Sequence, residues 1–343
     1  MKRVGFAFAA VLLVVGEVFL SGCLEGIEGR DETKSVFILV ADGVGARYLD
    51  FFETAEPKAL DGTELEKASV PVLNSLKEKS LYSILEVRFP ETTSSHSVFY
   101  IAGDCGREWE NTKSCVDNAG ITSLCDVARL EGHLCVMASE GGDFREARSE
   151  FDVAFFDAGK WDFRVERNSD TPEAVAVEEF FRGKAGEARD REGTLEEYSA
   201  FILKADAGFL EFMEARFPEK KFVLFSNAKG VDLCGHQRDA AGYAECIERI
   251  DYDLNAVLAF LSPDTVFALT ADHGMAFECS ECRGAHAGVP FNSAAESLEI
   301  PLIVLNTRDG KLESTDSSML VPVVFSAAGI PDACEKMRYC EAG

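Results

Sequence analysis

Continuous apolar runs that end at a turn recur along most of this chain, and they alternate with segments of helical spacing. The run Ser35-Val-Phe-Ile-Leu-Val-Ala41 is one example, and it stops at Asp42-Gly43. A run without polar alternation is typical of a strand that is covered on both faces, as in parallel sheets. Strands that alternate with helices therefore predict an α/β fold, with a mainly parallel central sheet covered by helices on both faces.

The expected elements follow one another from residue 35 onward. We expect strands at 35–41, 81–87, 134–138, 151–156, 221–226, 265–270 and 302–305. We expect helices at 70–79, from 97, at 121–131, at 172–216 with a loop around 183–193, and at 243–261. No internal repeat or interdomain linker interrupts the series, so we predict a single domain at 35–343.

The N-terminus has the features of an export signal. Lys2 and Arg3 precede an apolar stretch at 4–20, which ends in Leu-Ser-Gly-Cys23 and resembles a lipoprotein signal. We expect a lipoprotein-type signal peptide at 1–22, a lipidated Cys23 and a tether at 23–34. An uncleaved anchor and plain secretion are the alternatives, although the stretch is short for a membrane span. All three export the protein, and lipidation would hold it at the membrane or cell surface.

The charge of the chain limits its partners. The sequence has 60 Asp and Glu residues against 34 Lys and Arg residues, which gives a formal charge of −26. Repulsion at long range disfavours a nucleic acid duplex as a partner. A small phosphorylated substrate stays compatible with this charge, because bound cations reverse the local field. The sequence leaves the oligomeric state open.

Ten cysteines remain besides Cys23, and an even number in an exported chain indicates disulfides. The simplest pairing joins neighbours along the chain: Cys105–Cys115, Cys125–Cys135, Cys234–Cys246, Cys279–Cys282 and Cys334–Cys340. A zinc knuckle at 279–282 is the alternative for the fourth pair. It is disfavoured because the chain has no second cysteine pair with that spacing.

Side chains of the types that bind metals follow several expected strands. Asp42 follows the first strand, Asp232 and His236 follow the strand that ends at 226, and Asp272-His273 follows the strand at 265–270. Open α/β sheets bind ligands at the carboxyl ends of their strands, so these residues should share one edge, with His286 as a further member. Carboxylate oxygens and imidazole nitrogens together suit zinc, manganese or iron.

These residues carry a resemblance to the alkaline phosphatase superfamily, in particular to its type I phosphodiesterase/nucleotide pyrophosphatase branch. The segments that resemble the family are Val40-Ala-Asp-Gly-Val-Gly45, Asp232-Leu-Cys-Gly-His236, Thr270-Ala-Asp-His-Gly-Met275 and Ala285-His286-Ala-Gly-Val-Pro290. The resemblance implies a three-layer sandwich and two divalent metal ions, zinc or alternatively manganese. It assigns Asp42, Asp272, His273 and the nucleophile to one ion, and Asp232, His236 and His286 to the other.

The resemblance also implies a serine or threonine nucleophile at a helix start, ten residues before a glycine. Counting back from Gly103 gives Thr93, with Thr92 and Ser94 as alternatives. The hydroxyl would also cap the helix, and a helix N-terminus favours both an alkoxide and a phosphate. Two histidines are left over: we expect His96 near the site or at the surface, and His133 in a surface loop.

The expected function is hydrolysis of phosphodiesters or phosphomonoesters through a phospho-threonine intermediate. A phosphotransferase that acts on membrane-lipid head groups, or a non-catalytic surface binding protein that retains the fold, is the alternative. The chain has no Cys-x-Pro-x-Arg stretch, which the family's sulfatases need for their nucleophile, so sulfate esters are disfavoured. The phosphate-binding arginine of the monoesterases has no clear counterpart. Its candidates are Arg47, Arg107, Arg238 and Arg283.

Overall fold

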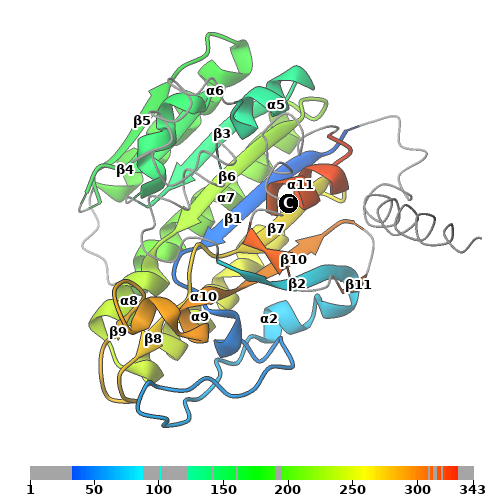
Figure 1. Cartoon of the computed structure of the whole chain (residues 1–343). Helices are drawn as coiled ribbons and strands as arrows, with labels where there is room; N and C mark the ends of the chain where they lie inside the picture. The colour runs from blue at the N-terminus through cyan, green and yellow to red at the C-terminus, as the bar shows by residue number, and fades with distance from the viewer. Residues whose placement is uncertain are drawn as a thin grey trace, which may run out of the picture. The chain divides into compact units, whose positions relative to one another are not determined.

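A long mixed sheet forms the centre of the computed structural model, which describes residues 33–87, 101, 122–140, 143–159, 161–189, 195–307, 310–311, 315–317 and 320–330 (Figure 1). The strand order is β11-β2-β10-β7-β1-β6-β3-β4-β5, and β12 also pairs with β2. The strands are β1 Ser35–Ala41, β2 Ser80–Glu86, β3 Leu134–Ser139, β4 Val153–Asp157, β5 Phe163–Arg167, β6 Phe222–Ala228, β7 Thr265–Thr270, β10 Glu299–Leu305, β11 Gly310–Lys311 and β12 Thr315–Asp316. The central strands from β7 to β4 are parallel, whereas β10 and β5 run antiparallel to their neighbours.

Helices cover both faces of the sheet, as expected for this class of fold. The α-helices are α2 Pro71–Asn74, α5 Leu124–Leu130, α6 Pro172–Ala188, α7 Leu195–Arg216, α8 Gly230–Gln237, α9 Ala240–Leu258, α10 Ala295–Leu298 and α11 Leu320–Ala327. The 3-10 helices are η1 Ala46–Tyr48, η2 Lys77–Lys79, η3 Asp143–Glu150 and η4 Phe291–Ser293, and a small hairpin pairs β8 Ala276–Phe277 with β9 Gly284–Ala285. Helix α7 packs against α6 and α9 to form one layer, and α5 and α11 lie on the opposite face in Figure 1.

The predicted strands form where continuous apolar runs were found. Every residue of β1, β6 and β7 is buried, because helices cover both faces of these central strands. The prediction is correct at both ends for β1 and β7, and it is displaced by a few residues for the other predicted strands. Strand β5 was not predicted. It is a half-exposed edge strand, and its alternating pattern is short.

The predicted helices within the described residues all have different ends in the structure: 70–79 is reduced to α2 and η2, 243–261 becomes 240–258, and the changes in α6 and α5 have clear physical reasons. The expected loop around 183–193 is wrong at its start, since α6 continues to Ala188. Gly183 lies within this helix, and an exposed glycine costs a helix only about 1 kcal/mol. The neighbouring side chains of Phe181 and Ala185 are buried and hold this turn of α6 against the core. Helix α5 begins at Leu124 rather than at 121, because the Ser123 side chain accepts from the Asp126 backbone amide and caps the helix there.

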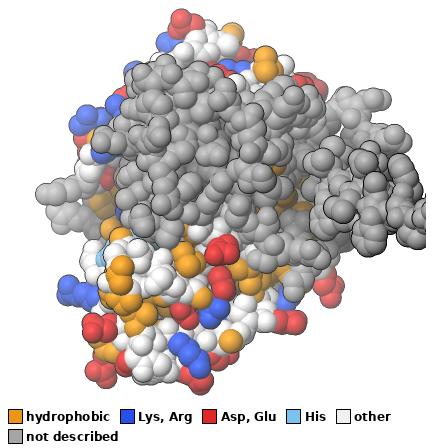
Figure 2. Space-filling view, in the orientation of Figure 1, with side chains coloured by type: hydrophobic (Ala, Val, Ile, Leu, Met, Phe, Trp, Pro, Cys, Tyr) orange, Lys and Arg blue, Asp and Glu red, His pale blue; other side chains and the backbone are white. Residues whose placement is uncertain are grey.

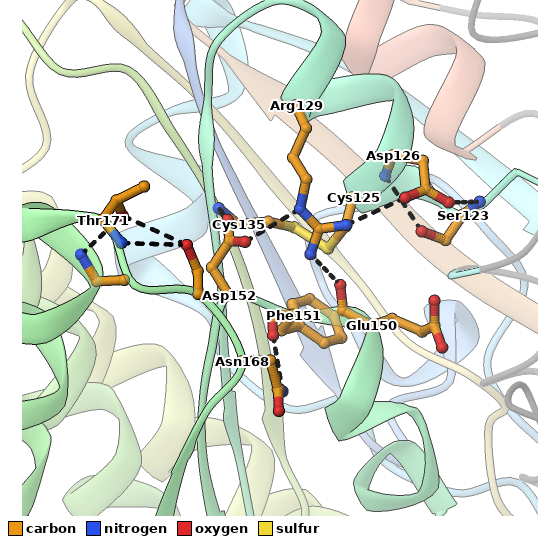
Figure 3. Close-up of polar contacts among 12 residues, drawn as sticks. Ser123, Cys125, Asp126, Arg129, Cys135, Glu150, Phe151, Asp152, Asn168 and Thr171 are labelled. Atoms are coloured by element: carbon orange, nitrogen blue, oxygen red, sulfur yellow. Dashed lines mark hydrogen bonds and ion pairs between the residues drawn. A yellow bond between two sulfur atoms is a disulfide. The ribbon is translucent and has the colours of Figure 1, made fainter.

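A polar network joins α5 to the beginning of β3 (Figure 3). Arg129 donates to Asp152 Oδ1 at 3.0 Å, to Asp126 Oδ1 at 3.1 Å and to the Glu150 carbonyl at 2.5 Å. The other oxygen of Asp152 accepts from the Cys135 backbone amide at 2.8 Å. Cys135 is also joined to Cys125 of α5 by a disulfide. The amino end of β3 is therefore held by a covalent bond as well as by charge-assisted hydrogen bonds.

Three of the predicted disulfides lie within the described residues, and all three are formed: Cys125–Cys135, Cys234–Cys246 and Cys279–Cys282. The zinc knuckle considered at 279–282 is therefore replaced by a disulfide. The predicted pairs Cys105–Cys115 and Cys334–Cys340 lie outside the described residues, as do the expected signal peptide at 1–22, Cys23 and most of the expected tether at 23–34.

His133 is not in a surface loop, contrary to expectation. Its residue is only 3% exposed, and its Nε2 lies 2.9 Å from the Lys34 carbonyl oxygen. The ring is covered because the turn between α5 and β3 packs against the segment that enters β1.

The described residues from Lys34 onward belong to one compact unit. The backbone amide of Lys34 already donates to the Ala328 carbonyl, so the end of the expected tether is part of the fold. Among the helices of the described residues, none is long and apolar enough to cross a membrane.

Candidate metal centre

Three aspartates lie where neighbouring parallel strands end. Asp42 directly follows β1, Asp232 lies in the first turn of α8 after β6, and Asp272 follows β7. Strand β1 pairs in parallel with β6 on one side and with β7 on the other. The carboxyl ends of these strands therefore share one edge of the sheet, and their aspartates converge there.

The loop after β1 reaches the start of α8 because residue 43 is glycine. Gly43 has a φ of +83°, and a Cβ at this position would lie 2.7 Å from the Asp232 Cα atom. The Gly43 amide donates to Asp272 Oδ1 at 3.1 Å, and the Asp232 amide donates to the Asp42 carbonyl at 3.0 Å. A side chain at residue 43 would separate these segments, so the glycine permits the aspartates to approach one another.

Two groups of buried side chains are close enough for each to hold a metal ion. Asp42, Asp272 and His273 form one group, and Asp232, His273 and His286 form the other; within each, the ligand atoms lie within 4.8 Å of one another. His273 belongs to both groups. Its Nε2 lies 3.6 Å from Asp42 Oδ1, 3.5 Å from Asp272 Oδ2 and 3.9 Å from Asp232 Oδ1.

The other two histidines lie on the Asp232 side. His236 Nε2 is 3.2 Å from Asp232 Oδ1, and His286 Nε2 is 3.8 Å from the same oxygen. His236 comes from α8, one turn after Asp232, and His286 directly follows β9. The structure thus brings together all six described side chains that were expected to bind metal.

Hydrogen bonds hold two imidazole rings in the orientation that a metal requires. The Nδ1 atom of His273 lies 2.8 Å from the Gly274 carbonyl oxygen, and Nδ1 of His236 lies 3.3 Å from the Gly284 carbonyl oxygen. A carbonyl only accepts, so Nδ1 carries the proton in each ring. In the neutral ring, Nε2 is then left as a lone-pair donor that faces the aspartates.

Several atoms of this cluster are buried without a hydrogen-bond partner in the described structure: Asp42 Oδ1, Asp232 Oδ1, Asp272 Oδ2, His273 Nε2 and His286 Nδ1. Buried polar atoms almost always have a partner, so their gathering at one place calls for one that they share. Oxygen and imidazole donors without thiolate suit zinc, manganese or iron. The residues present therefore fit divalent cations.

The electrostatics of the cluster show the cost of gathering these charges. Burial raises the pKa of Asp42 well above its usual range, and burial raises that of Asp272 to about 7, with neighbouring carboxylates adding to both shifts. Burial also acts to raise the pKa of Asp232. The nearby His236 ring, when it is protonated, and the charge of His273 outweigh that effect and lower the pKa of Asp232 to about 2. Bound cations would relieve the repulsion among the three carboxylates.

Sequence reasoning missed Lys229, which precedes α8. Its Nζ lies 3.8 Å from Asp232 Oδ2, and its side chain is 21% exposed. The spacing of three residues from Asp232 at a helix start was the available signal. Arg47 was one of the candidates for a phosphate-binding arginine. In the structure its guanidinium donates two 2.8 Å hydrogen bonds to the Glu299 carboxylate.

Other predicted residues do not join the centre or cannot be placed. Arg238 lies 4.0 Å from Glu245, and Arg283 is exposed. The expected nucleophile Thr93 lies outside the described residues, together with Thr92, Ser94, His96 and Arg107. The centre is open to solvent on one side, since the His236 side chain is 39% exposed. Histidine surface is visible in Figure 2 near the place of α8 and β9 in Figure 1.

Comparison with known proteins finds a family profile and curated relatives that match parts of this chain. Residues 176–325 match the profile of the Metalloenzyme superfamily. Among curated proteins, the phosphopentomutase of Edwardsiella ictaluri is 25% identical over 253 residues, which is 66% of this chain and 58% of that protein. The phosphopentomutase of Anaeromyxobacter dehalogenans is 37% identical over 97 residues, covering 27% of this chain and 23% of that protein. The match thus spans little more than half the length of the first relative and about a quarter of the length of the second.

Solved structures share the fold at low sequence identity. A mutant of TAB5 alkaline phosphatase with magnesium bound matches 87% of this chain and 99% of its own, with a TM-score of 0.53 and 13% identity. The lipoteichoic acid synthase LtaP of Listeria monocytogenes matches 88% of this chain and 73% of its own, with a TM-score of 0.57 and 15% identity. Together these structural matches show an alkaline phosphatase-like α/β fold, and they specify no branch of that superfamily.

Proposed function

We propose that the protein is a metal-dependent hydrolase of phosphate esters. The observation that carries this proposal is the double group around His273: two sets of buried carboxylate and imidazole donors that share one ring and leave atoms unpaired. Two cations a few ångströms apart are the usual arrangement for in-line displacement at phosphorus.

The residues divide into two sets in this proposal. Asp42, Asp272 and His273, with Thr93, would hold one divalent cation, and Asp232, His236 and His286 would hold the second. Zinc is the first candidate and manganese the alternative. When bound, such cations supply Lewis-acid charge that stabilises the attacking and leaving oxygens.

The chain itself would supply the nucleophile. The Thr93 hydroxyl would attack phosphorus and lose its proton, and the bond to the leaving group would break, so that this group departs as an alcohol. Water would then cleave the phospho-threonine bond, releasing phosphate from a monoester or a phosphomonoester from a diester. The nearly complete burial of Asp42, Asp272 and His273 supports strong electrostatic interactions with the reacting group, because water screens them little.

Phosphoryl transfer is a second candidate, favoured by the sequence match to proteins named phosphopentomutase. The same side chains would act, and an alcohol, such as a lipid head group, would replace water as the acceptor. Product analysis separates the two: hydrolysis releases free phosphate, whereas transfer yields a phosphorylated acceptor.

Metal content and substrate preference test the proposal together. The purified protein is supplied with zinc or manganese, its metal content is measured, and nitrophenyl phosphomonoester, phosphodiester and sulfate are offered. We expect close to two equivalents of metal and nitrophenol release from a phosphate ester but not from the sulfate. A protein that binds no metal and cleaves none of these esters would instead be a binding protein that retains the fold.

Variants of the threonine run test the nucleophile. Thr93→Ala should abolish turnover while the far-ultraviolet circular dichroism stays unchanged, and Thr92→Ala and Ser94→Ala should keep most activity. Full activity in Thr93→Ala, with loss in one of the other two variants, would move the nucleophile to that residue.

A further inference from the structure

Lys229 combines a place beside the metal centre with partial access to solvent. Its ammonium lies 3.8 Å from Asp232 Oδ2. Among the described lysines and arginines, it is the one at ion-pair distance from an aspartate of the centre. The 21% exposure of its side chain leaves it within reach of a ligand that enters from solvent.

The backbone around Lys229 is held by two buried side chains from other elements. Its amide donates to Glu140 Oε2 at 2.6 Å, and the next amide, of Gly230, donates to Ser199 Oγ at 2.8 Å. Ser199 in turn donates to Glu140 Oε2 at 3.1 Å. Helix α8 has no cap from its own N-cap side chain, so Glu140 after β3 and Ser199 of α7 supply the acceptors.

A fixed ammonium at this position has a cost in a site built for cations. The ammonium of Lys229 repels a divalent ion that approaches Asp232. Once cations neutralise the aspartates, the lysine is no longer needed to balance their charge, so its place beside Asp232 needs another explanation. An anionic ligand does account for it, because the ammonium and the cations would then attract the same group. In a chain of charge −26, such a local positive charge adds to the attraction that bound cations exert on a phosphate.

We infer that Lys229 binds the phosphoryl group of the substrate, and that Glu140 and Ser199 position it by fixing the start of α8. This inference rests on the proposed function and narrows its substrate class. An ammonium attracts a dianion more strongly than a monoanion, so the residue favours phosphomonoesters over phosphodiesters. Lys229 would then fill the role of the phosphate-binding arginine, for which the sequence offers no clear candidate.

Binding of inorganic phosphate to the metal-loaded protein tests this role without relying on turnover. Calorimetric titration compares the wild type with Lys229→Met, Lys229→Arg and the control Lys184→Met, whose lysine pairs with Glu187 on the surface of α6. We expect Lys229→Met to weaken phosphate binding roughly tenfold to hundredfold, the range for a charge-assisted hydrogen bond. Lys229→Arg should recover part of this loss, and Lys184→Met should change nothing.

The affinity for metal separates phosphate binding from mere charge balance. Lys229→Met should bind zinc as tightly as the wild type or more tightly, because a repelling charge is gone. The positioning role predicts that Glu140→Ala weakens phosphate binding and that Glu140→Gln, which keeps an acceptor oxygen, restores it. KM for nitrophenyl phosphate should rise more in Lys229→Met than KM for the diester.

The outcomes distinguish this inference from the proposed function. A wild type that loads metal and cleaves phosphate esters, with unchanged phosphate affinity in Lys229→Met, overturns the role of Lys229 alone. A wild type that binds neither metal nor phosphate overturns both.

Discussion

The rings of His273 and His286 stack with their centroids 3.6 Å apart and their planes 9° from parallel. The contact joins the segment after β7 to the segment after β9, so two loops share one side of the metal centre. Burial lowers the pKa of His286 to about 3, and the charge of His273 adds to this effect. His286 is therefore neutral at neutral pH, which is the form of the ring that binds metals.

The two stacked histidines should differ in what their loss does to metal content. His273 lies in both groups of ligand atoms, whereas His286 lies only in the group of Asp232. We expect His273→Ala to lose the cation beside Asp42 and Asp272 and to weaken the second, whose ligand His286 stacks on this ring, and we expect His286→Ala to lose only the second, as measured by metal analysis after gel filtration. The control His133→Gln, at the opposite end of β3, should keep the wild-type content. Near wild-type metal content in His273→Ala would contradict the shared role.

A matched pair of glycines tests the close approach of β1 and α8. Gly43 and Gly62 have φ values of +83° and +90°, but a Cβ would meet Asp232 only at Gly43 and has open space at Gly62. Gly62→Ala should cost about 1–2 kcal/mol of unfolding free energy, the penalty of the left-handed conformation. Gly43→Ala should cost about 1–3 kcal/mol more, from the clash, and should weaken metal binding. Equal losses in urea unfolding would show that the clash relaxes freely.

Two disulfides of similar loop length separate stability from metal affinity. Cys234–Cys246 and Cys125–Cys135 close loops with sequence separations of 12 and 10, so the usual entropy model gives each about 3 kcal/mol. Only Cys234 lies among the ligands, in α8 between Asp232 and His236. Replacing either pair with alanine should lower stability by a similar amount.

The affinity for zinc should respond differently in the two disulfide variants. Loss of Cys234–Cys246 should weaken it roughly tenfold to hundredfold, as for other groups that orient metal ligands. Loss of Cys125–Cys135 should leave it unchanged in calorimetric titration. Equal zinc affinities in the two variants would show that the Cys234–Cys246 disulfide does not help to hold the metal ligands in place.

The buried carboxyl group of Asp206 makes stability depend on pH. Asp206 of α7 accepts from Ser226 Oγ at 2.7 Å, and burial raises its pKa to about 8, against about 3.9 in an unfolded chain. Between these values the folded state keeps a proton that the unfolded state releases. Each pH unit of increase therefore lowers the free energy of unfolding by up to about 1.4 kcal/mol through this group.

An asparagine at residue 206 should remove this dependence. Asp206→Asn should gain stability relative to the wild type as pH rises from 5 to 8, measured by urea unfolding at constant metal. Glu53→Gln, at a side chain that is 92% exposed, serves as the control and should follow the wild-type slope. Parallel curves for wild type and Asp206→Asn would refute the proton held in the folded state.

Much of the centre was predictable because its ligands are attached to strong local signals. The apolar runs of β1 and β7 predict both strands by themselves. Asp42 comes directly after the first run, and Asp272 and His273 follow the second run after Ala271. Parallel pairing then places them at one edge, which is a general property of such sheets. The three described disulfides joined cysteines close in sequence, where short loops favour pairing.

The sequence by itself thus predicted the class of fold, the ends of β1 and β7, and the six described side chains of metal-binding type that gather at one edge of the sheet. Only the tertiary structure decided that His273 is shared between two groups, that Lys229 faces Asp232, and that Glu140 supports its backbone. It also decided the burial of His133. These features depend on contacts between elements distant in the chain, and local patterns carry no information about which side chains meet after helices pack on the sheet.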